Sequence, residues 1–170
     1  MATKKCRVIA FPQGDARQEK AKRARTKEKP EIFIRQPEDI FNIVSSWGKR
    51  KQENFLVVTL NAAHKVIKIH HITKGLINRT IVHPRECFCP TIKDLASAVV
   101  FVHNHPSGSV SPSYEDEIIT KRLTMAGSIL GINVLDHLVI SKNNFFSFRK
   151  EGKLETNNYE KKIDALIAEK

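Results

Sequence analysis

The sequence predicts a single α/β domain in which helices flank a mixed β-sheet. The chain has 170 residues, which is enough for one domain with its own core and too few for two sizeable ones. Apolar, strand-like runs are interspersed with segments of helical spacing, as in α/β folds. No apolar run approaches the roughly 18 residues needed to cross a membrane. We therefore expect one folded domain and no membrane span.

The first predicted helix covers residues 37–47. Pro37 suits the first helical position, and the acidic residues Glu38 and Asp39 fill the first turn. Apolar residues then recur at helical spacing. The helix should end near Gly48.

The predicted sheet begins with a β-hairpin. Two apolar strands, at residues 55–60 and 66–72, are joined by a short turn, and residues 76–82 are expected to continue the sheet. The next helix opens at Pro84. Pro90 should shorten or kink this helix, or restart it at the following residue, because proline lacks a backbone donor and clashes with the preceding turn.

The second half of the chain completes the sheet. Gly131 follows a long helical pattern and is an expected residue just past a helix end. The elements follow in the order strand, loop, helix, strand, strand and helix, at residues 99–103, 107–112, 113–130, 134–140, 145–148 and 159–168. We expect three regions: a basic extension at 1–30, the folded domain at 31–152 and a C-terminal extension at 153–170.

His103 and His105 are the residues most indicative of function. They are two positions apart at the end of a predicted strand, and side chains at positions i and i+2 of a strand lie on the same face. Both imidazoles should therefore leave the strand end together. Asp116 would complete a set of three ligands for one divalent metal ion. The fourth tetrahedral position would remain open for water, as in catalytic zinc sites.

Ser113 and Asp116 have two interpretations. They fit a helix start, with Ser113 as the N-cap and Asp116 as the acidic residue of a capping box. They also fit a functional site, and a capping role for Ser113 does not exclude catalysis. His-x-His-Pro, a loop with Gly108 and then Ser-x-x-Asp together have few packing explanations. We therefore expect a metal site here.

The same stretch resembles the JAMM (MPN+) metal motif in the form found in bacterial RadC-like proteins. The likeness covers roughly residues 31–152 and includes the segments 82–86, 103–108, 112–116, 126–127, 130–132 and 135–140. The resemblance implies a zinc-binding domain of the JAB/MPN type, with cytidine-deaminase-like layering. The better-known relatives of such domains are metallopeptidases and deubiquitinating isopeptidases.

The resemblance also implies a role for each matching residue. His103, His105 and Asp116 match the zinc ligands, and Ser113 matches the serine that helps to stabilise the oxyanion. The expected activity is hydrolysis of a peptide or isopeptide-like amide by metal-activated water. The substrate cannot be read from these residues.

The general base has two candidates. Glu53 lies where RadC-like chains carry Glu-x-Phe before an apolar strand, and it is the favoured one. A carboxylate within hydrogen-bond reach of the metal-bound water would take its proton and pass it to the leaving amine. Glu86 is the rival, because His-Pro-Arg-Glu also belongs to the family pattern.

Other residues could support the site or only the fold. Asp136 and His137 are either a pair that orients a metal ligand or part of a strand in which the aspartate caps a neighbouring turn. Cys87 and Cys89 are expected to be buried thiols beside a helix. With Cys6 they do not form a disulfide framework. Together with the absence of a secretory pattern, the cysteines favour a cytoplasmic protein.

The charge of the chain is concentrated in its N-terminal extension. Residues 1–30 carry ten Lys/Arg and three Asp/Glu, so they supply +7 of the net charge of +11. Such a segment either is a solvated tail or contacts nucleic acid nonspecifically through phosphates. A DNA-associated, repair-linked protein with a non-catalytic metal site is therefore the alternative function, since the RadC name carries a historical association with DNA repair.

Overall fold

The computed structural model describes residues 30–75 and 82–155, together with Tyr159, Lys161, Ala165 and Ala168. The chain divides into two units, Met1–Glu31 and Ile32–Lys170, and the fold lies in the second. The expected boundaries at residues 30 and 152 stay predictions. The expected strand at 76–82 lies outside the described residues except for Val82, which is buried and is not in a strand.

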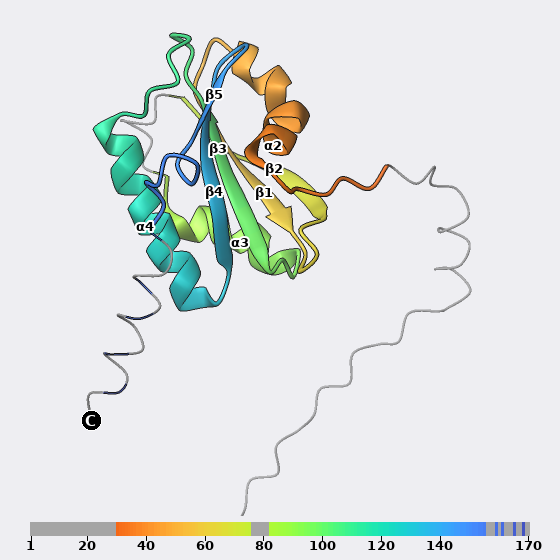
Figure 1. Cartoon of the computed structure of the whole chain (residues 1–170), viewed down its shortest axis with the longest axis vertical. Coiled ribbons are helices and arrows are strands. Elements are labelled where there is room, and N and C mark those ends of the chain that lie inside the picture. Colours follow the sequence, from red (N-terminus) through yellow and green to blue (C-terminus); the bar gives the residue numbers. More distant parts are fainter. Residues whose placement is uncertain are drawn as a thin grey trace, which may run out of the picture. The chain divides into compact units, whose positions relative to one another are not determined.

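A mixed sheet of five strands forms the centre of the domain (Figure 1). The strands are β1 (Asn54–Leu60), β2 (Val66–Lys74), β3 (Ala98–Asn104), β4 (Asn133–Ile140) and β5 (Phe145–Ser147). They pair in the order β2-β1-β3-β4-β5. Only β3 and β4 are parallel, and the other neighbours are antiparallel. The predicted hairpin and the predicted central strand are both confirmed.

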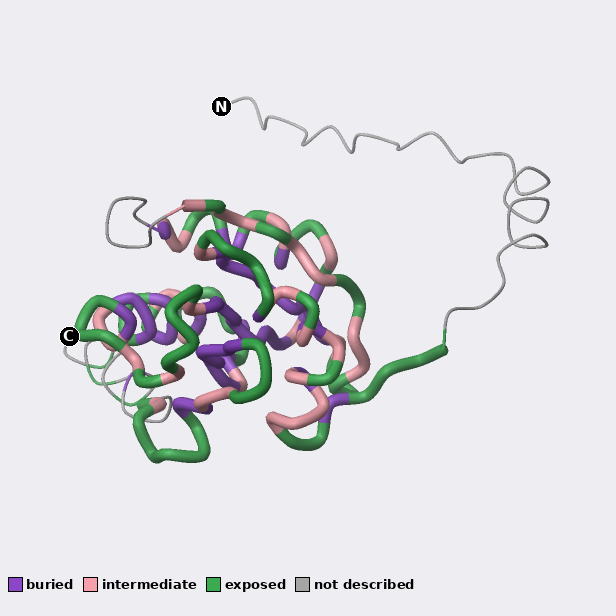
Figure 2. The backbone as a smooth tube through the Cα atoms, turned by 90° about the horizontal axis from the view of Figure 1, so that it is seen from above, coloured by how far each residue is buried: buried purple, intermediate pink, exposed green. Residues whose placement is uncertain are grey.

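Helices cover the two faces of this sheet. One face packs against α2 (Pro37–Val44), whereas the other packs against α3 (Pro84–Lys93) and α4 (Tyr114–Leu130). Alternate residues of the strands fill two separate cores. Leu56 and Val102 belong to the core under α2, whereas Phe55 and Phe101 belong to the core under α3 and α4. Figure 2 shows the buried residues gathered between the exposed loops. The predicted α/β class with a mixed sheet is correct.

The helix ends follow the sequence signals closely, with one exception. Ser113 caps α4, and Gly131 ends it in the left-handed conformation, as predicted. The first helix continues beyond Val44 as a 3-10 turn, η1 (Ser45–Lys49). Pro90 lies inside α3, which runs on to Lys93 without a restart. The missing N–H removes one hydrogen bond, to the carbonyl four residues earlier, and α3 continues for one more turn before it ends.

A β-bulge in β4 changes which side chains face α4. Val99 of β3 pairs with Val134, but the next residue, Val100, pairs with Asp136. The extra residue shifts the alternation of β4 by one position. His137 therefore pairs with Phe101 in a parallel ladder and lies on the α4 side of the sheet. Without the bulge, His137 would point toward α2.

Candidate metal centre

The two predicted histidines leave the end of β3 on the side of the sheet that α4 covers. Phe101 and His103 alternate with residues of the opposite core, so the His103 ring lies against α4 and is fully buried. The His105 N–H donates to the Ile140 carbonyl at 3.0 Å. This bond extends the pairing with β4 for one residue beyond the strand. The His105 ring lies beside that of His103, with the ring centroids 4.9 Å apart.

The start of α4 holds the third residue. The Ser113 hydroxyl accepts from the Asp116 N–H at 3.2 Å, while the Ser113 N–H and hydroxyl donate to Asp116 Oδ2 at 2.7 and 2.8 Å. This capping box fixes the Asp116 carboxylate, whose residue is only 2% exposed. The capping interpretation of the sequence is therefore correct. It also explains how Asp116 is held toward the histidines.

Three potential ligand atoms converge at this point. His103 Nε2 lies 3.1 Å from Asp116 Oδ1 and 3.1 Å from His105 Nε2, and His105 Nε2 lies 3.4 Å from Asp116 Oδ2. One ligand atom from each residue lies within 4.8 Å of the others. Two imidazoles and one carboxylate are a ligand set that zinc accepts in catalytic sites.

The hydrogen bonds of His105 fit a role as a metal ligand. Its Nδ1 lies 3.0 Å from the Ser109 carbonyl oxygen. A carbonyl only accepts hydrogen bonds, so Nδ1 carries the proton. In the neutral ring, Nε2 then presents a lone pair to the carboxylate of Asp116. Two acceptor atoms at this separation need a cation or a proton between them.

The charges around Asp116 also favour a cation at this point. Burial raises the pKa of Asp116, but its close interactions with the rings of His103 and His105 outweigh burial and leave this pKa well below its ordinary value. The same interaction with Asp116 raises the pKa of His105, and the charge of Glu53 adds to that effect. An ionised carboxylate thus attracts positive charge to the point between the two rings.

Glu53 lies at the same edge of the sheet as this cluster. It immediately precedes β1, in which Phe55 pairs with His103. Asn54 donates from its N–H and side-chain amide to Asn104 Oδ1, at 2.8 and 3.2 Å, so the two strand ends are tied together. Glu53 also lines a cavity of about 340 Å³ with Pro106 and Ser107, which directly follow His105.

Glu86 has different surroundings. It is exposed in the first turn of α3, where its charge contributes to the raised pKa of Cys87, after burial. The structure therefore brings Glu53, rather than Glu86, beside His105. Whether Glu53 acts as a base stays a prediction. The expectation for the thiols is correct for Cys87, which is buried, and wrong for Cys89, which is exposed on the same helix.

Asp136 caps a neighbouring turn, as one interpretation of the sequence expected, and that His137 orients a metal ligand stays a prediction. Asp136 accepts hydrogen bonds from the Ser147 hydroxyl at 2.5 Å and from the Arg149 N–H at 2.9 Å, and so holds the turn after β5. His137 Nε2 lies 2.9 Å from Nδ1 of His103. Burial lowers the pKa of His137 well below its ordinary value, and the neighbouring His103 adds to that shift.

Thr120 is a further residue of this cluster that the sequence did not predict. Its hydroxyl oxygen lies 2.6 Å from His137 Nδ1 and is buried one turn after Asp116 on α4. The spacing of four residues from Asp116, which places both side chains on one helix face, was the signal that could have revealed it.

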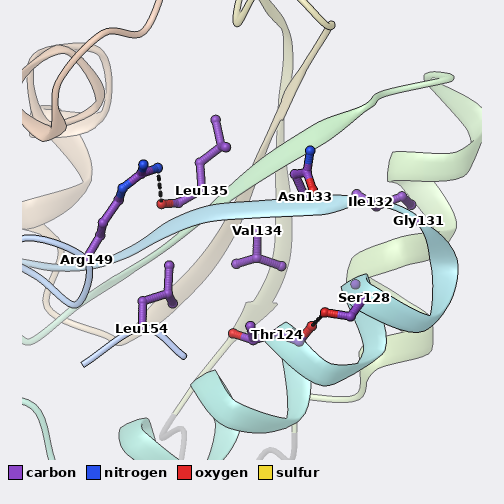
Figure 3. Close-up of a pocket in the computed structure, with 10 residues that line it drawn as sticks. Thr124, Ser128, Gly131, Ile132, Asn133, Val134, Leu135, Arg149 and Leu154 are labelled. Carbon is purple, nitrogen blue, oxygen red and sulfur yellow. Dashed lines mark hydrogen bonds between the residues drawn. The ribbon is translucent and has the colours of Figure 1, made fainter. Parts of the chain in front are cut away.

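A second cavity lies outside this cluster. It has a volume of about 530 Å³ and lies between the second half of α4 and the start of β4 (Figure 3). Thr124 and Ser128 line it from α4, and Arg149 donates to the Leu135 carbonyl at its rim at 3.3 Å. Of the described residues that line it, Arg149 is the one with an ionisable side chain. None of the predicted site residues lines this cavity.

The fold and the cluster define an α/β domain with a candidate two-histidine, one-aspartate metal centre at the end of its central strand. Residues 34–153 match the RadC-like JAB domain family, and the chain belongs to this family. The resemblance based on the sequence motifs is therefore confirmed. Within the part of the chain that the structure describes, no helix is long and apolar enough to cross a bilayer.

Three curated proteins are similar to this chain over most of its length. A UPF0758 protein of Methanospirillum hungatei is 47% identical over 129 residues, which cover 75% of this chain and 57% of that protein. One from Alkaliphilus metalliredigens is 47% identical over 70% of this chain and 52% of its own length. One from Staphylococcus aureus is 42% identical over 79% and 59%. The chain thus spans little more than half the length of these curated relatives.

Proposed function

We propose that this protein is a zinc-dependent hydrolase of the JAMM type that cleaves a peptide or isopeptide-like amide. The observation that carries the proposal is the convergence of His103, His105 and Asp116, whose ligand atoms lie within 4.8 Å of one another. Membership of the RadC-like JAB family supports it, because the better-known relatives of JAB domains are metallopeptidases. His103, His105 and Asp116 would hold the ion.

Each residue of the site has a task in this reaction. Bound zinc would lower the pKa of a water molecule toward neutrality and polarise the amide carbonyl. Glu53 would accept the proton of the attacking water and then donate it to the leaving amine. The Ser113 hydroxyl, which now donates to Asp116 Oδ2 at 2.8 Å, would rotate and donate to the developing oxyanion.

Two variants at the general base test the catalytic part of the proposal. Glu53→Gln keeps the size of the side chain but removes the base, so we expect normal zinc content and loss of cleavage. Glu86→Gln is the matched control and should cleave like wild type. The assay is mass spectrometry of a mixed peptide library incubated with each zinc-loaded protein. No zinc-dependent cleavage by wild type, or unchanged cleavage by Glu53→Gln, would contradict the proposed mechanism.

A substitution at Ser113 distinguishes a loss of catalysis from a loss of metal binding. Ser113→Ala should retain zinc and lose about 100- to 1,000-fold in turnover, the usual effect of losing one oxyanion donor. His103→Ala and Asp116→Ala should lose zinc as well. Equal zinc content in all three variants would show that the ligands are assigned wrongly.

The basic extension supports a second proposal, that the protein also contacts nucleic acid through phosphates. Its net charge of +7 within 30 residues is the observation in favour. Deletion of residues 1–30 should abolish salt-sensitive binding of duplex DNA and leave zinc content unchanged. Equal DNA affinity of the full and shortened chains would remove this proposal.

A further inference from the structure

A buried chain of hydrogen bonds runs from the candidate ligand His103 back to α4. His103 Nδ1 lies 2.9 Å from His137 Nε2, and His137 Nδ1 lies 2.6 Å from the Thr120 hydroxyl oxygen. That hydroxyl lies 2.5 Å from the backbone carbonyl oxygen of Asp116. His103 and His137 are 0% exposed and Thr120 is 1% exposed. Bulk water therefore has no direct access to these groups.

The donors and acceptors in this series of hydrogen bonds follow from Thr120, its last side chain. The Asp116 carbonyl can only accept, so the Thr120 hydroxyl must donate its single hydrogen to it. Thr120 then has only lone pairs left for the contact with His137. The proton of this contact must accordingly reside on His137 Nδ1.

The next bond is fixed in the same way. A neutral imidazole carries one N–H, so His137 with its proton on Nδ1 presents a lone pair at Nε2. His103 must then donate from Nδ1 across the 2.9 Å contact. This leaves a lone pair on His103 Nε2, the atom that lies 3.1 Å from Asp116 Oδ1. If His137 donated to His103 instead, the N–H of His103 would lie on Nε2, the candidate ligand atom.

We propose that Thr120 and His137 are positioning residues that fix the proton of His103 on Nδ1 and so present Nε2 to the metal. This inference rests on the proposed metal site. Metal-bound histidines usually donate their other N–H to an oxygen or to water. Here the acceptor is a second histidine, His137. Thr120, on the same helix as Asp116, determines which nitrogen of His137 is free to accept.

The fold supplies the geometry for this arrangement. The bulge in β4 turns His137 toward α4, and Phe55 and Phe148 enclose its ring at centroid distances of 5.5 and 5.1 Å. Thr120 lies one helical turn after Asp116. A shift of α4 would therefore move the candidate ligand Asp116 and the last side chain of the hydrogen-bonded series together.

Substitutions of threonine on α4 test the proposal. Thr120→Val keeps the shape of the side chain and removes the hydroxyl, whereas Thr120→Ser retains it. Thr124→Val is the matched control, because the Thr124 hydroxyl is also buried and donates to the carbonyl four residues earlier at 2.8 Å. A purely structural role of the Thr120 hydroxyl within the helix would therefore affect both valine variants alike.

The measurement is zinc affinity of the full chain, obtained by competition with a chromophoric chelator. Thr120→Val should bind zinc about 10- to 100-fold more weakly, the usual effect of losing a group that orients a ligand. Thr120→Ser and Thr124→Val should match wild type. If wild type binds zinc and Thr120→Val binds it equally well, the positioning role is wrong and the metal site stands. If wild type does not bind zinc, both fail.

The position of the proton on His137 provides a second readout. Long-range ¹H–¹⁵N correlation spectra of the zinc-loaded protein distinguish imidazole Nδ1–H from Nε2–H. We expect His137 as the Nδ1–H form in wild type and in Thr120→Ser. An Nε2–H form of His137 in wild type would reverse the direction of the chain and overturn the proposal.

Discussion

Asp116→Asn should separate the stability of the protein from its capacity to bind metal. The asparagine side chain has the same shape as aspartate. Its oxygen can accept from the Ser113 N–H, as Asp116 Oδ2 does at 2.7 Å. Its amide nitrogen would then occupy the place of Oδ1, 3.1 Å from the His103 Nε2 lone pair, and would donate to it.

The expected magnitudes follow from these contacts. A hydrogen bond to a charged group is worth about 1 kcal/mol more than one between neutral groups, so weakening the cap of α4 costs roughly that amount. The new bond to His103 offsets about 1 kcal/mol. The metal-free variant should thus unfold within about 1 kcal/mol of wild type. Its zinc affinity should fall by more than the roughly 10- to 100-fold typical of an outer-shell change, since a ligand and its charge are both lost.

Urea unfolding in the presence of a chelator measures the stability of the metal-free variant. Zinc competition in the absence of that chelator measures its zinc affinity. Asp116→Ala is the control, because it leaves the Ser113 N–H without its acceptor and should cost about 1 kcal/mol more through the lost cap. If the free energy of unfolding of metal-free Asp116→Asn falls by more than about 2 kcal/mol, the hydrogen bonds assigned to the asparagine are wrong. Zinc affinity equal to that of wild type would refute the ligand assignment.

Two further predictions concern the fold around the site. Gly48→Ala should destabilise the protein by about 3 kcal/mol, because the added Cβ would lie within 2.5 Å of two backbone atoms of Ser141; a urea midpoint equal to that of wild type would show that η1 does not approach this backbone so closely. At mildly alkaline pH, Cys87 should resist alkylation in the native protein because burial raises its pKa well above the usual range, whereas the exposed Cys89 should react. Peptide mapping by mass spectrometry measures both thiols, and equal labelling would contradict the packing of α3.

The convergence of the three candidate ligands could be predicted because it depends on local periodicity. The two-residue repeat of a strand places His103 and His105 together, and the capping signal at Ser113 marks the start of α4 and thus the position of Asp116. Both signals lie within a few residues of the ligands. Gly131 ends the same helix for an equally local reason, since glycine adopts the left-handed conformation easily.

The supporting residues depend on contacts that no local pattern records. The face that His137 presents is set by a bulge in the pairing of β3 with β4, and a bulge is not evident in the alternation of a largely buried strand. Thr120 shares a helix face with Asp116 by its spacing, but that spacing does not identify its partner. Its role becomes visible only when α4 is packed against β4.

Placing Glu53 at the same sheet edge as the candidate site likewise required the register of the sheet. Both residues belong to the family pattern; Glu53 immediately precedes β1, and Glu86 lies in the first turn of α3. The antiparallel pairing of Phe55 with His103 brings the residues just before β1 to the end of β3, while Glu86 lies exposed on α3. Strand register of this kind joins residues 50 positions apart in the chain, as the bond from Asn54 to Asn104 does.

Elemental analysis of the purified protein, without chelators, tests the metal centre most directly. His105→Ala is the suitable comparison, because the His105 side chain is 14% exposed and its removal disturbs the core less than removal of the buried His103. We predict one zinc per wild-type chain and little or none in His105→Ala. Wild-type protein without zinc, or equal zinc in both proteins, would contradict the assignment of His103, His105 and Asp116 as a metal site.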